Sequence, residues 1–243
     1  MRIARRLWRA TIIAALLIAL ICWYLVWTRA HPQDSPFTEL DLTQPVGLFT
    51  GRKLAALDND TQLCHTLLFR AAVDYRPLPP AGSAQCAYDN AVRLGQGGAR
   101  RIAFRPERLD VSCPVAAGLA VWEWRVVQPA AKRIFGARVT AIDHFGSYSC
   151  RRIYGRSTGD WSEHARANAL DVAGFRLADG RRITVVNGWN KGTPDEQAFL
   201  REVRDGACRL FATVLSPDYN AAHRDHLHLD EAERGAFGGR ACR

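Results

Sequence analysis

The chain has 243 residues, enough for one large or two small domains, and 48% of them are hydrophobic, enough to form a packed core. This composition excludes an intrinsically disordered chain. The formal net charge is +9, but more than half of it comes from five arginines within the first thirty residues, which contain no acidic residue. The remaining charge is too small and too scattered to indicate nucleic-acid binding. The five are Arg2, Arg5, Arg6, Arg9 and Arg29.

Residues 1–30 form a unit of their own. The run TIIAALLIALICWYLVW, Thr11 to Trp27, is uncharged and has about the minimum length of a helix that crosses a bilayer. The preceding arginines favour a cytoplasmic N-terminus, and aromatic residues suit the two membrane interfaces. We therefore expect a single-pass anchor in the cytoplasmic membrane, with the rest of the chain outside the cytoplasm. A cleaved signal peptide is the alternative, although the run is long for one and Arg29 interrupts its small-residue site.

The cysteines agree with a location outside the cytoplasm. Apart from Cys22 in the apolar run, there are six, widely spaced and without the C-x-x-C pair of zinc knuckles or thioredoxin-like sites. The sequence therefore predicts three disulfides, with buried free thiols as the alternative, and does not select their pairing. The six are Cys64, Cys86, Cys113, Cys150, Cys208 and Cys242.

The first half of the chain gives short signals. Residues 31–51 contain Pro, Thr and Asp without hydrophobic periodicity, and they are interpreted as a linker to a domain spanning residues 52–243. A helix is expected near residues 60–72, because leucines recur on one side of it. Strand-like segments follow at residues 91–94 and 101–104.

The middle of the chain predicts helices followed by a long loop. One helix is expected to begin at Pro114 and to break at Pro129, before a short helix that ends at Gly136. A strand at residues 138–142 comes next. The loop GSYSCRRIYGRSTGDWSEH, residues 146–164, is long and rich in Arg, Ser and Gly, which is more typical of a functional loop than of a plain connection.

The second half predicts a hairpin, a helix and two more strands. Residues 168–189 are interpreted as two strands joined at the ADGR turn. A helix at residues 194–211 should begin with a capping box of Thr193 and Glu196. Short strands are expected at residues 213–215 and 226–230. This order of elements predicts an α+β fold with an antiparallel sheet and flanking helices.

The last predicted strand brings two histidines together. Side chains alternate along a strand, so His226 and His228 should share one face while Leu227 and Leu229 face the core. Two imidazoles on one face are a metal-binding arrangement. A hydrolytic zinc site needs three protein ligands and an open position, so further ligands are required.

The segment SEHARANALDV offers the further ligands. His164 ends the long loop, and Asp171 lies seven residues later inside the apolar stretch ALDVAGF. A buried aspartate is costly unless it has a strong partner. That partner is either a divalent cation or one of the nearby arginines.

Together, SEHARANALD and HRDHLH resemble the signature of the LAS metallopeptidases, which include D-Ala-D-Ala carboxypeptidases, dipeptidases and murein endopeptidases. The closer resemblance is to the bacterial extensin-like C-terminal domain family, which is related to that group. This resemblance extends from Cys64 to Cys242, and the matching segments follow one another in the order and with the spacing typical of the family. They are GSYSCR, SEHARANALDVAGF, FLREVRDGAC, VLSPDYN and HRDHLHLD.

This resemblance implies a zinc site with His164, Asp171 and His228 as ligands. His226 would then lie beside the metal-bound water as general base or as donor to the developing oxyanion. Asp225 stands where carboxypeptidases of the group carry a glutamate base. The identity of the general base is thus open among His226, Asp225 and His223. His223 matches an accessory histidine of murein endopeptidases, and it is expected to hold a charge or a substrate carbonyl.

Other positions receive supporting roles from the same resemblance. Arg151 matches an arginine near the substrate and suits a carboxylate of a stem peptide or the tetrahedral intermediate, with a surface salt bridge as the alternative. Ser162 and Glu163 are expected to cap the turn at His164 or to support it. Ala167 replaces a usual glycine, at little expected cost. Three histidines are interpreted as ordinary surface or half-buried residues: His31, His65 and His144.

The expected function is zinc-dependent hydrolysis of peptide bonds in peptidoglycan, by a domain that faces the periplasm. An endopeptidase is favoured over a carboxypeptidase because of the accessory histidine. The alternatives are a non-catalytic cell-wall-binding or scaffolding domain with a structural metal and, with less support because further ligands are missing, a metal phosphoesterase.

Overall fold

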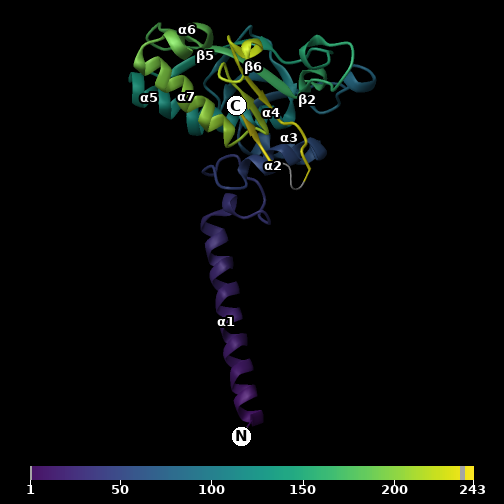
Figure 1. Ribbon diagram of the computed structural model, residues 1–243, viewed down its shortest axis with the longest axis vertical. Coiled ribbons are helices and arrows are strands. Elements are labelled where there is room, and N and C mark those ends of the chain that lie inside the picture. The colour runs from purple at the N-terminus through teal and green to yellow at the C-terminus, as the bar shows by residue number, and fades with distance from the viewer. Residues whose placement is uncertain (1, 236–238) are drawn as a thin grey trace.

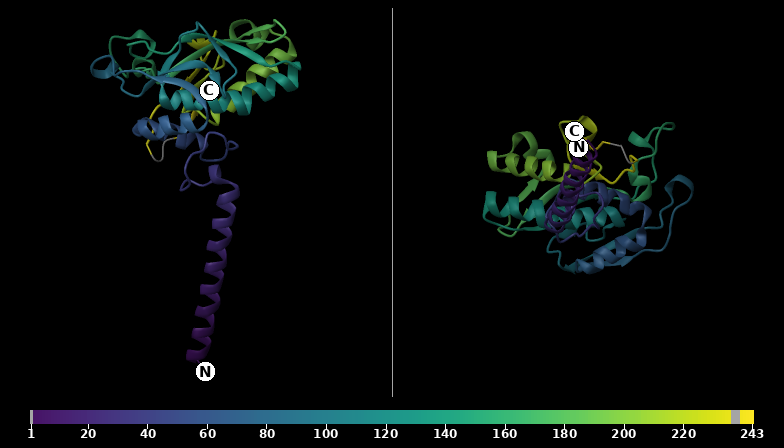
Figure 2. Two further views of the ribbon diagram at one scale, coloured as in Figure 1. Left: turned by 180° about the vertical axis from the view of Figure 1, so that it is seen from behind. Right: turned by 90° about the horizontal axis from the view of Figure 1, so that it is seen from below.

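The computed structural model describes residues 2–235 and 239–243. Helix α1 (Arg2–Ala30) extends away from a body formed by the rest of the described chain (Figures 1 and 2). Nearly all of its side chains are exposed, and its length and apolar composition suit a membrane span or a signal sequence. Helix α1 is thus separate from the core of the body.

The segment between α1 and the body is folded onto the body. Leu40 and Leu42 belong to the hydrophobic core. Nζ of Lys53 donates to the carbonyl oxygen of Pro32 at 2.9 Å, and the guanidinium of Arg125 donates to a carbonyl of this segment. Residues 31–51, interpreted from the sequence as a linker, therefore hold α1 close to the body instead of separating the two.

Two of the predicted helices are confirmed with small differences at their ends. Asp60 caps α3 by accepting a hydrogen bond from the backbone of Leu63, and the capping box of Thr193 and Glu196 opens α7. The predicted extension of α7 beyond Cys208 is absent. The helices of the described body are α2 (Thr50–Ala56), α3 (Thr61–Arg70), α4 (Cys113–Trp122), α5 (Gln128–Phe135), α6 (Val185–Lys191) and α7 (Pro194–Cys208).

The predicted break at Pro129 is wrong. A π-helical turn, η4 (Glu123–Val127), joins α4 to α5 without a loop, and Pro129 lies in the first turn of α5. The wide turn already shifts the hydrogen-bond ladder, so the missing N–H of proline does not end the helical path. The same turn places Glu123 in the interior, where its carboxylate pairs with Arg100 at 3.1 Å.

The strands form two sheets. A three-stranded sheet has the order β1-β2-β4, and a seven-stranded sheet has the order β10-β8-β9-β6-β5-β3 with β7 paired to β6. The strands of the smaller sheet are β1 (Val73–Pro77), β2 (Ala91–Gly98) and β4 (Asp110–Ser112). Those of the larger sheet are β3 (Ala103–Arg105), β5 (Val139–Gly146), β6 (Ala169–Leu177), β7 (Arg182–Thr184), β8 (Thr213–Leu215), β9 (Leu227–Asp230) and β10 (Ala241–Cys242).

The α+β class is confirmed, but an entirely antiparallel sheet is not. The central pairs β5–β6, β6–β9 and β8–β9 are antiparallel, whereas β3–β5 and β10–β8 are parallel. Parallel neighbours need long connections, and here α4, η4 and α5 lie between β3 and β5, while β9 lies between β8 and β10. The larger sheet is thus mixed, with antiparallel pairs at its centre and a parallel pair at each end.

The hairpin predicted at ADGR is present, but its second arm is short. The backbone N–H of Leu177 donates to the carbonyl of Arg181 at 2.9 Å, which closes the turn between β6 and β7. Beyond Thr184 the chain forms helix α6, where the sequence predicted more strand. Trp189 of α6 is buried, and Gly188 lies close against Leu200 of α7. Packing between these helices overrides the β-branched character of the segment.

The three predicted disulfides are confirmed, while Cys22 is free and exposed. Cys64–Cys113 joins α3 to α4, Cys86–Cys150 joins the smaller sheet's loop to the long loop after β5, and Cys208–Cys242 joins α7 to β10. Each bond connects segments that are 34 to 64 residues apart in the chain. The disulfides therefore restrain the tertiary arrangement around the larger sheet.

Candidate metal centre

The register of β6 and β9 places polar and apolar side chains on opposite faces of the sheet. Asp171 lies directly opposite His228, while Leu170 and its partner Leu229 are part of the core. Because side chains alternate along both strands, Asp171 and His228 point together to the face away from that core. A polar site is thus built at the centre of the sheet.

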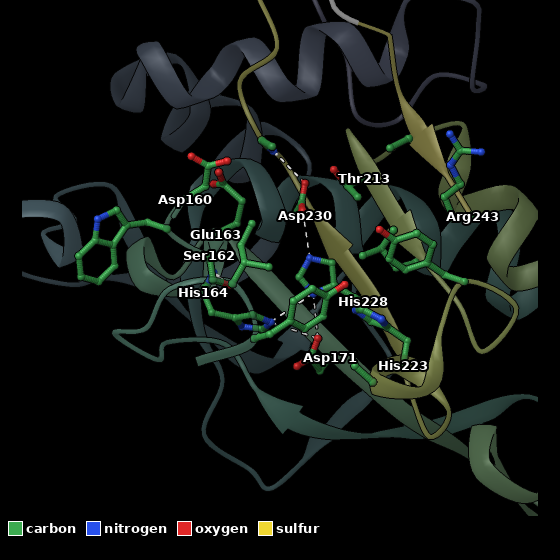
Figure 3. A pocket seen from close by; sticks show the side chains of 18 of the residues that line it. Asp160, Ser162, Glu163, His164, Asp171, Thr213, His223, His228, Asp230 and Arg243 are labelled. Atoms are coloured by element: carbon green, nitrogen blue, oxygen red, sulfur yellow. Dashed lines mark hydrogen bonds and ion pairs between the residues drawn. The ribbon is translucent and has the colours of Figure 1, made fainter. Parts of the chain in front are cut away.

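Three ligand-type atoms meet at this point (Figure 3). Nε2 of His164 is 3.1 Å from Oδ1 of Asp171 and 3.2 Å from Nδ1 of His228. Nδ1 of His228 is 3.0 Å from the same Asp171 oxygen. His164 reaches them from a short 3₁₀ turn, η6 (Glu163–Arg166), at the end of the long loop. The structure therefore brings together two segments that are far apart in the chain.

The outer nitrogen of each histidine is held by a protein acceptor. Nδ1 of His164 donates to the carbonyl oxygen of Ser147 at 2.6 Å, and Nε2 of His228 donates to Oδ2 of Asp230 at 3.0 Å. A neutral imidazole has one N–H, so the two inner nitrogens then carry lone pairs. Such outer acceptors orient the histidines of metal sites. Asp230 was not singled out by the sequence analysis, although it alternates with His228 in HLHLD and so shares its face.

These donors fit a divalent cation. Two bare imidazole nitrogens and a carboxylate oxygen repel one another unless a positive charge lies among them. Ligand atoms in a tetrahedral zinc site are separated by roughly 3.3 Å, since each lies about 2.0–2.1 Å from the metal. The separations of 3.0 to 3.2 Å among His164, Asp171 and His228 come close to that value.

Without a metal, bound protons supply part of the positive charge that the carboxylate and the ring nitrogens require. Burial disfavours the ionised forms of Asp171 and His228, but the hydrogen bonds of Asp171 to His164 and His228 outweigh it. The pKa of Asp171 is therefore lowered, and the pKa of His228 rises to about 9, with Asp230 contributing a further hydrogen bond. A proton and a cation would compete for the same position.

A histidine–aspartate pair lies beside the cluster. Nδ1 of His226 donates to Oδ1 of Asp225 at 2.9 Å, and its Nε2 lies 3.5 Å from Oδ1 of Asp171. The ring also packs edge-on against Phe145. His226 thus presents Nε2 towards the candidate metal position, while Asp225 faces its outer side.

His223 lines the same pocket and is held by Asn220. Its Nδ1 donates to Oδ1 of Asn220 at 2.8 Å, and burial together with the charges of His226 and His228 lowers its pKa to about 4. The remaining Nε2 therefore carries a lone pair at neutral pH. In this form His223 presents a hydrogen-bond acceptor to the pocket.

The centre lies in a pocket of about 510 Å³. Arg151 lines it from the long loop, half-buried and without an ion pair to any described residue. Tyr154, Trp161 and Tyr219 contribute aromatic walls, and Arg243 lines the pocket from the end of the chain (Figure 3). The pocket thus combines a polar floor with a partly aromatic rim.

The residues around His164 have structural contacts. The hydroxyl of Ser162 accepts from the backbone N–H of His164, and the carboxylate of Glu163 accepts from the amide of Asn168 at 2.8 Å. Ala167 adopts a left-handed conformation with φ of 56°. That conformation costs a residue with a Cβ roughly 1–2 kcal/mol, so the expectation of little cost was wrong.

Three histidines lie outside the pocket. His31 is exposed and His65 is half-buried, as expected. His144 is buried on β5, with Nε2 2.9 Å from the carbonyl oxygen of Pro106, so the expectation of a surface or half-buried residue was wrong for it. Its burial lowers the pKa, and the ring supports the sheet edge.

Comparison with known proteins identifies one family. No curated protein and no solved structure matches this chain. A family model described as extensin-like protein C-terminus matches residues 62–243, which include His164, Asp171 and His228 and the six disulfide-bonded cysteines. From residue 62 onward the chain therefore belongs to the family of extensin-like protein C-terminal domains.

Proposed function

We propose that this protein is a zinc-dependent peptidase that hydrolyses peptide bonds in peptidoglycan stem peptides or cross-links, as an endopeptidase more than as a carboxypeptidase. The observation that carries the proposal is the convergence of His164, Asp171 and His228, whose inner atoms lie 3.0 to 3.2 Å apart next to the His226–Asp225 pair. The resemblance of the two motifs to the LAS metallopeptidases supports the same chemistry.

The arrangement supports His226 as the proton-transfer residue. Zinc bound to the three ligands would lower the pKa of a water molecule and polarise the scissile carbonyl. Nε2 of His226 faces that position and can take a proton from the attacking water, while Asp225 holds Nδ1–H and stabilises the charged ring. The protonated His226 can then donate to the leaving amine.

Other pocket residues provide substrate contacts. The guanidinium of Arg151, which forms no ion pair with any described residue, suits a carboxylate of a stem peptide. Nε2 of His223 can accept from a substrate amide N–H, which fits a peptide bond flanking the one that is cut. With α1 as an anchor in the cytoplasmic membrane, the domain would face the periplasm and its murein.

The alternative is a cell-wall-binding or scaffolding domain that keeps the metal for structure. The burial of His164 and His228 favours it, because a structural site is shielded from solvent. The pocket beside them favours the enzyme, because a shielded structural site needs no cavity.

The experiment incubates the full-length protein in detergent with isolated sacculi and one equivalent of zinc. New amine termini should appear, muropeptide mass spectrometry should identify the bond, and both chelation and His164→Ala should abolish release. His65→Ala is the matched control and should retain activity. Sacculus binding with a zinc-dependent melting temperature, but without new amine termini, would support the scaffolding alternative. Release that survives both chelator and His164→Ala would contradict the proposal.

A further inference from the structure

A second cavity lies at the end of the body from which α1 departs. It has a volume of about 710 Å³ and lies between α2 and residues 232–235 and 239–240. Figure 1 shows α2 on the side of the body that faces α1, with the C-terminal segment in yellow beside it. This cavity is distinct from the candidate metal centre, which it meets only at the shared wall of residues 232–234.

The cavity is strongly basic. Arg52, Arg234 and Arg240 line it, and Arg209 lies next to Arg240, whose guanidinium donates to the carbonyl of Arg209. None of the four forms an ion pair within 4.0 Å with a carboxylate of residues 2–235 or 239–243, although the buried Glu231 lies close enough to act electrostatically on Arg240. Glu233 is the single acidic residue among the described lining. Four arginines gathered in one place, with fewer carboxylates than guanidinium groups around them, attract an anion.

The same end of the body carries exposed apolar side chains. Phe37 is 88% exposed and Leu48 is 75% exposed, and Leu48 and Phe49 form part of the cavity wall. Backbone and side chains of Ala55, Ala56 and Ala212 add further apolar lining. A ligand that matches this wall has both an anionic group and an apolar part.

The position of this end relative to α1 is fixed by contacts. The hydroxyls of Tyr24 and Ser35 lie 2.8 Å apart, and Lys53 is bonded to Pro32. Trp23 and Trp27 stack near the end of α1, where aromatic rings settle at a membrane interface. If α1 spans a bilayer, the cavity and the exposed Leu48 therefore lie close to the headgroups.

We propose that this cavity binds the headgroup of an anionic phospholipid of the membrane that α1 spans, and so docks the body on that membrane. The phosphate would lie between Arg52 and Arg240, and the glycerol and first methylene groups would contact Leu48 and Phe49. The inference rests on α1 as a membrane span and does not depend on peptidase activity.

The test measures binding of short-chain lipids to the full-length protein in a neutral detergent. Dihexanoyl phosphatidylglycerol should bind at least about tenfold more tightly than dihexanoyl phosphatidylcholine or inorganic phosphate, since only the first has both a net charge and acyl chains. Arg52→Ala and Arg240→Ala should each weaken its binding by about three- to tenfold. Arg76→Ala, on the exposed strand β1, is the matched control and should change nothing.

Three outcomes would overturn the proposal. Equal affinities for phosphatidylglycerol and phosphatidylcholine would show that the cavity does not select an anionic headgroup. An affinity for inorganic phosphate equal to that for phosphatidylglycerol would show that the cavity binds simple anions and not a lipid. Unchanged affinity in both arginine variants would also contradict it. Zinc affinity should be the same in all variants, so failure of this docking site is distinguishable from failure of the metal centre.

Discussion

His228 lies opposite Asp171 across the antiparallel pair β6–β9, with Nδ1 and Oδ1 3.0 Å apart, and its other nitrogen donates to Asp230 two residues further along the same strand. One strand thus supplies both a candidate ligand and the carboxylate that orients it. A metal can bind Nδ1 of His228 only when that nitrogen carries no proton, so metal binding and protonation of this ring are coupled.

Substitution of Asp230 should weaken zinc binding. Asp230→Ala removes the acceptor that holds His228 in the tautomer with a bare Nδ1, so we expect a loss of affinity of about 10–100-fold. Competition with a chromophoric chelator measures it. Asp179→Asn, in the exposed hairpin turn, is the control and should bind zinc normally. Unchanged affinity in Asp230→Ala would remove Asp230 from the site.

Variants of the histidine–aspartate pair should separate chemistry from metal binding. His226→Ala should lower kcat by about 10²–10⁴-fold, because it removes the proton acceptor, while zinc content stays at one equivalent. Asp225→Asn should have a smaller effect, since it weakens only the orientation of the ring. Stopped assays on purified muropeptides, with elemental analysis of each variant, measure both quantities. A larger loss in Asp225→Asn than in His226→Ala would assign the base to Asp225.

The metal-free protein should have a stability maximum in pH set by two histidines. The folded-state pKa of His223 is lowered to about 4, so its contribution to the free energy of unfolding grows as pH rises from 4 towards the ordinary value of 6.5. The pKa of His228 is raised to about 9, so its contribution is complete below 6.5 and is lost as pH rises to 9.

Zinc should remove the alkaline part of this profile, because the metal binds the unprotonated ring and its affinity increases with pH. Melting temperatures between pH 4 and 9, with chelator and with zinc, measure the effect. A melting temperature that stays level from pH 6.5 to 9 in chelator would show that His228 does not hold a proton in the metal-free protein.

The disulfide between Cys86 and Cys150 should govern substrate binding through the loop that carries Arg151. Replacing both cysteines by serine should raise KM, while zinc affinity is kept because the candidate ligands lie on η6, β6 and β9. Replacement of Cys64 and Cys113, neither of which lines the pocket, is the matched control. Each pair should lose about 2–4 kcal/mol of stability, but only the first should change KM. Equal KM values in both variants would contradict a role in positioning Arg151.

The buried pair of Arg100 and Glu123 should be important for folding. Both side chains are 2% exposed, and Glu123 also accepts from the backbone N–H groups of Arg101 and Ile102. Arg100→Met leaves a buried carboxylate without its counter-charge and should cost about 3–5 kcal/mol in urea unfolding. Arg133→Ala, which breaks an exposed pair with Glu202, should cost less than about 1 kcal/mol. Similar losses in both variants would contradict this difference.

The sequence by itself determined the apolar helix, the capped helix α7, the hairpin turn at Asp179 and Gly180, and the even set of cysteines outside the apolar run. These features depend on local periodicity, capping and turn chemistry, which neighbouring residues encode. The three residues His164, Asp171 and His228 were also identified from two short motifs, and the structure brings them together.

Only the tertiary structure decided how distant segments pair. The parallel strands β3 and β10, the helix α6 in place of a strand, and the folded segment before α2 all depend on contacts between residues far apart in the chain. The role of Asp230 and the orientation of His226 by Asp225 likewise depend on ring positions that spacing does not fix. Sequence pattern selects the residue types of a site, whereas strand register and loop packing set which nitrogen of each ring faces its centre.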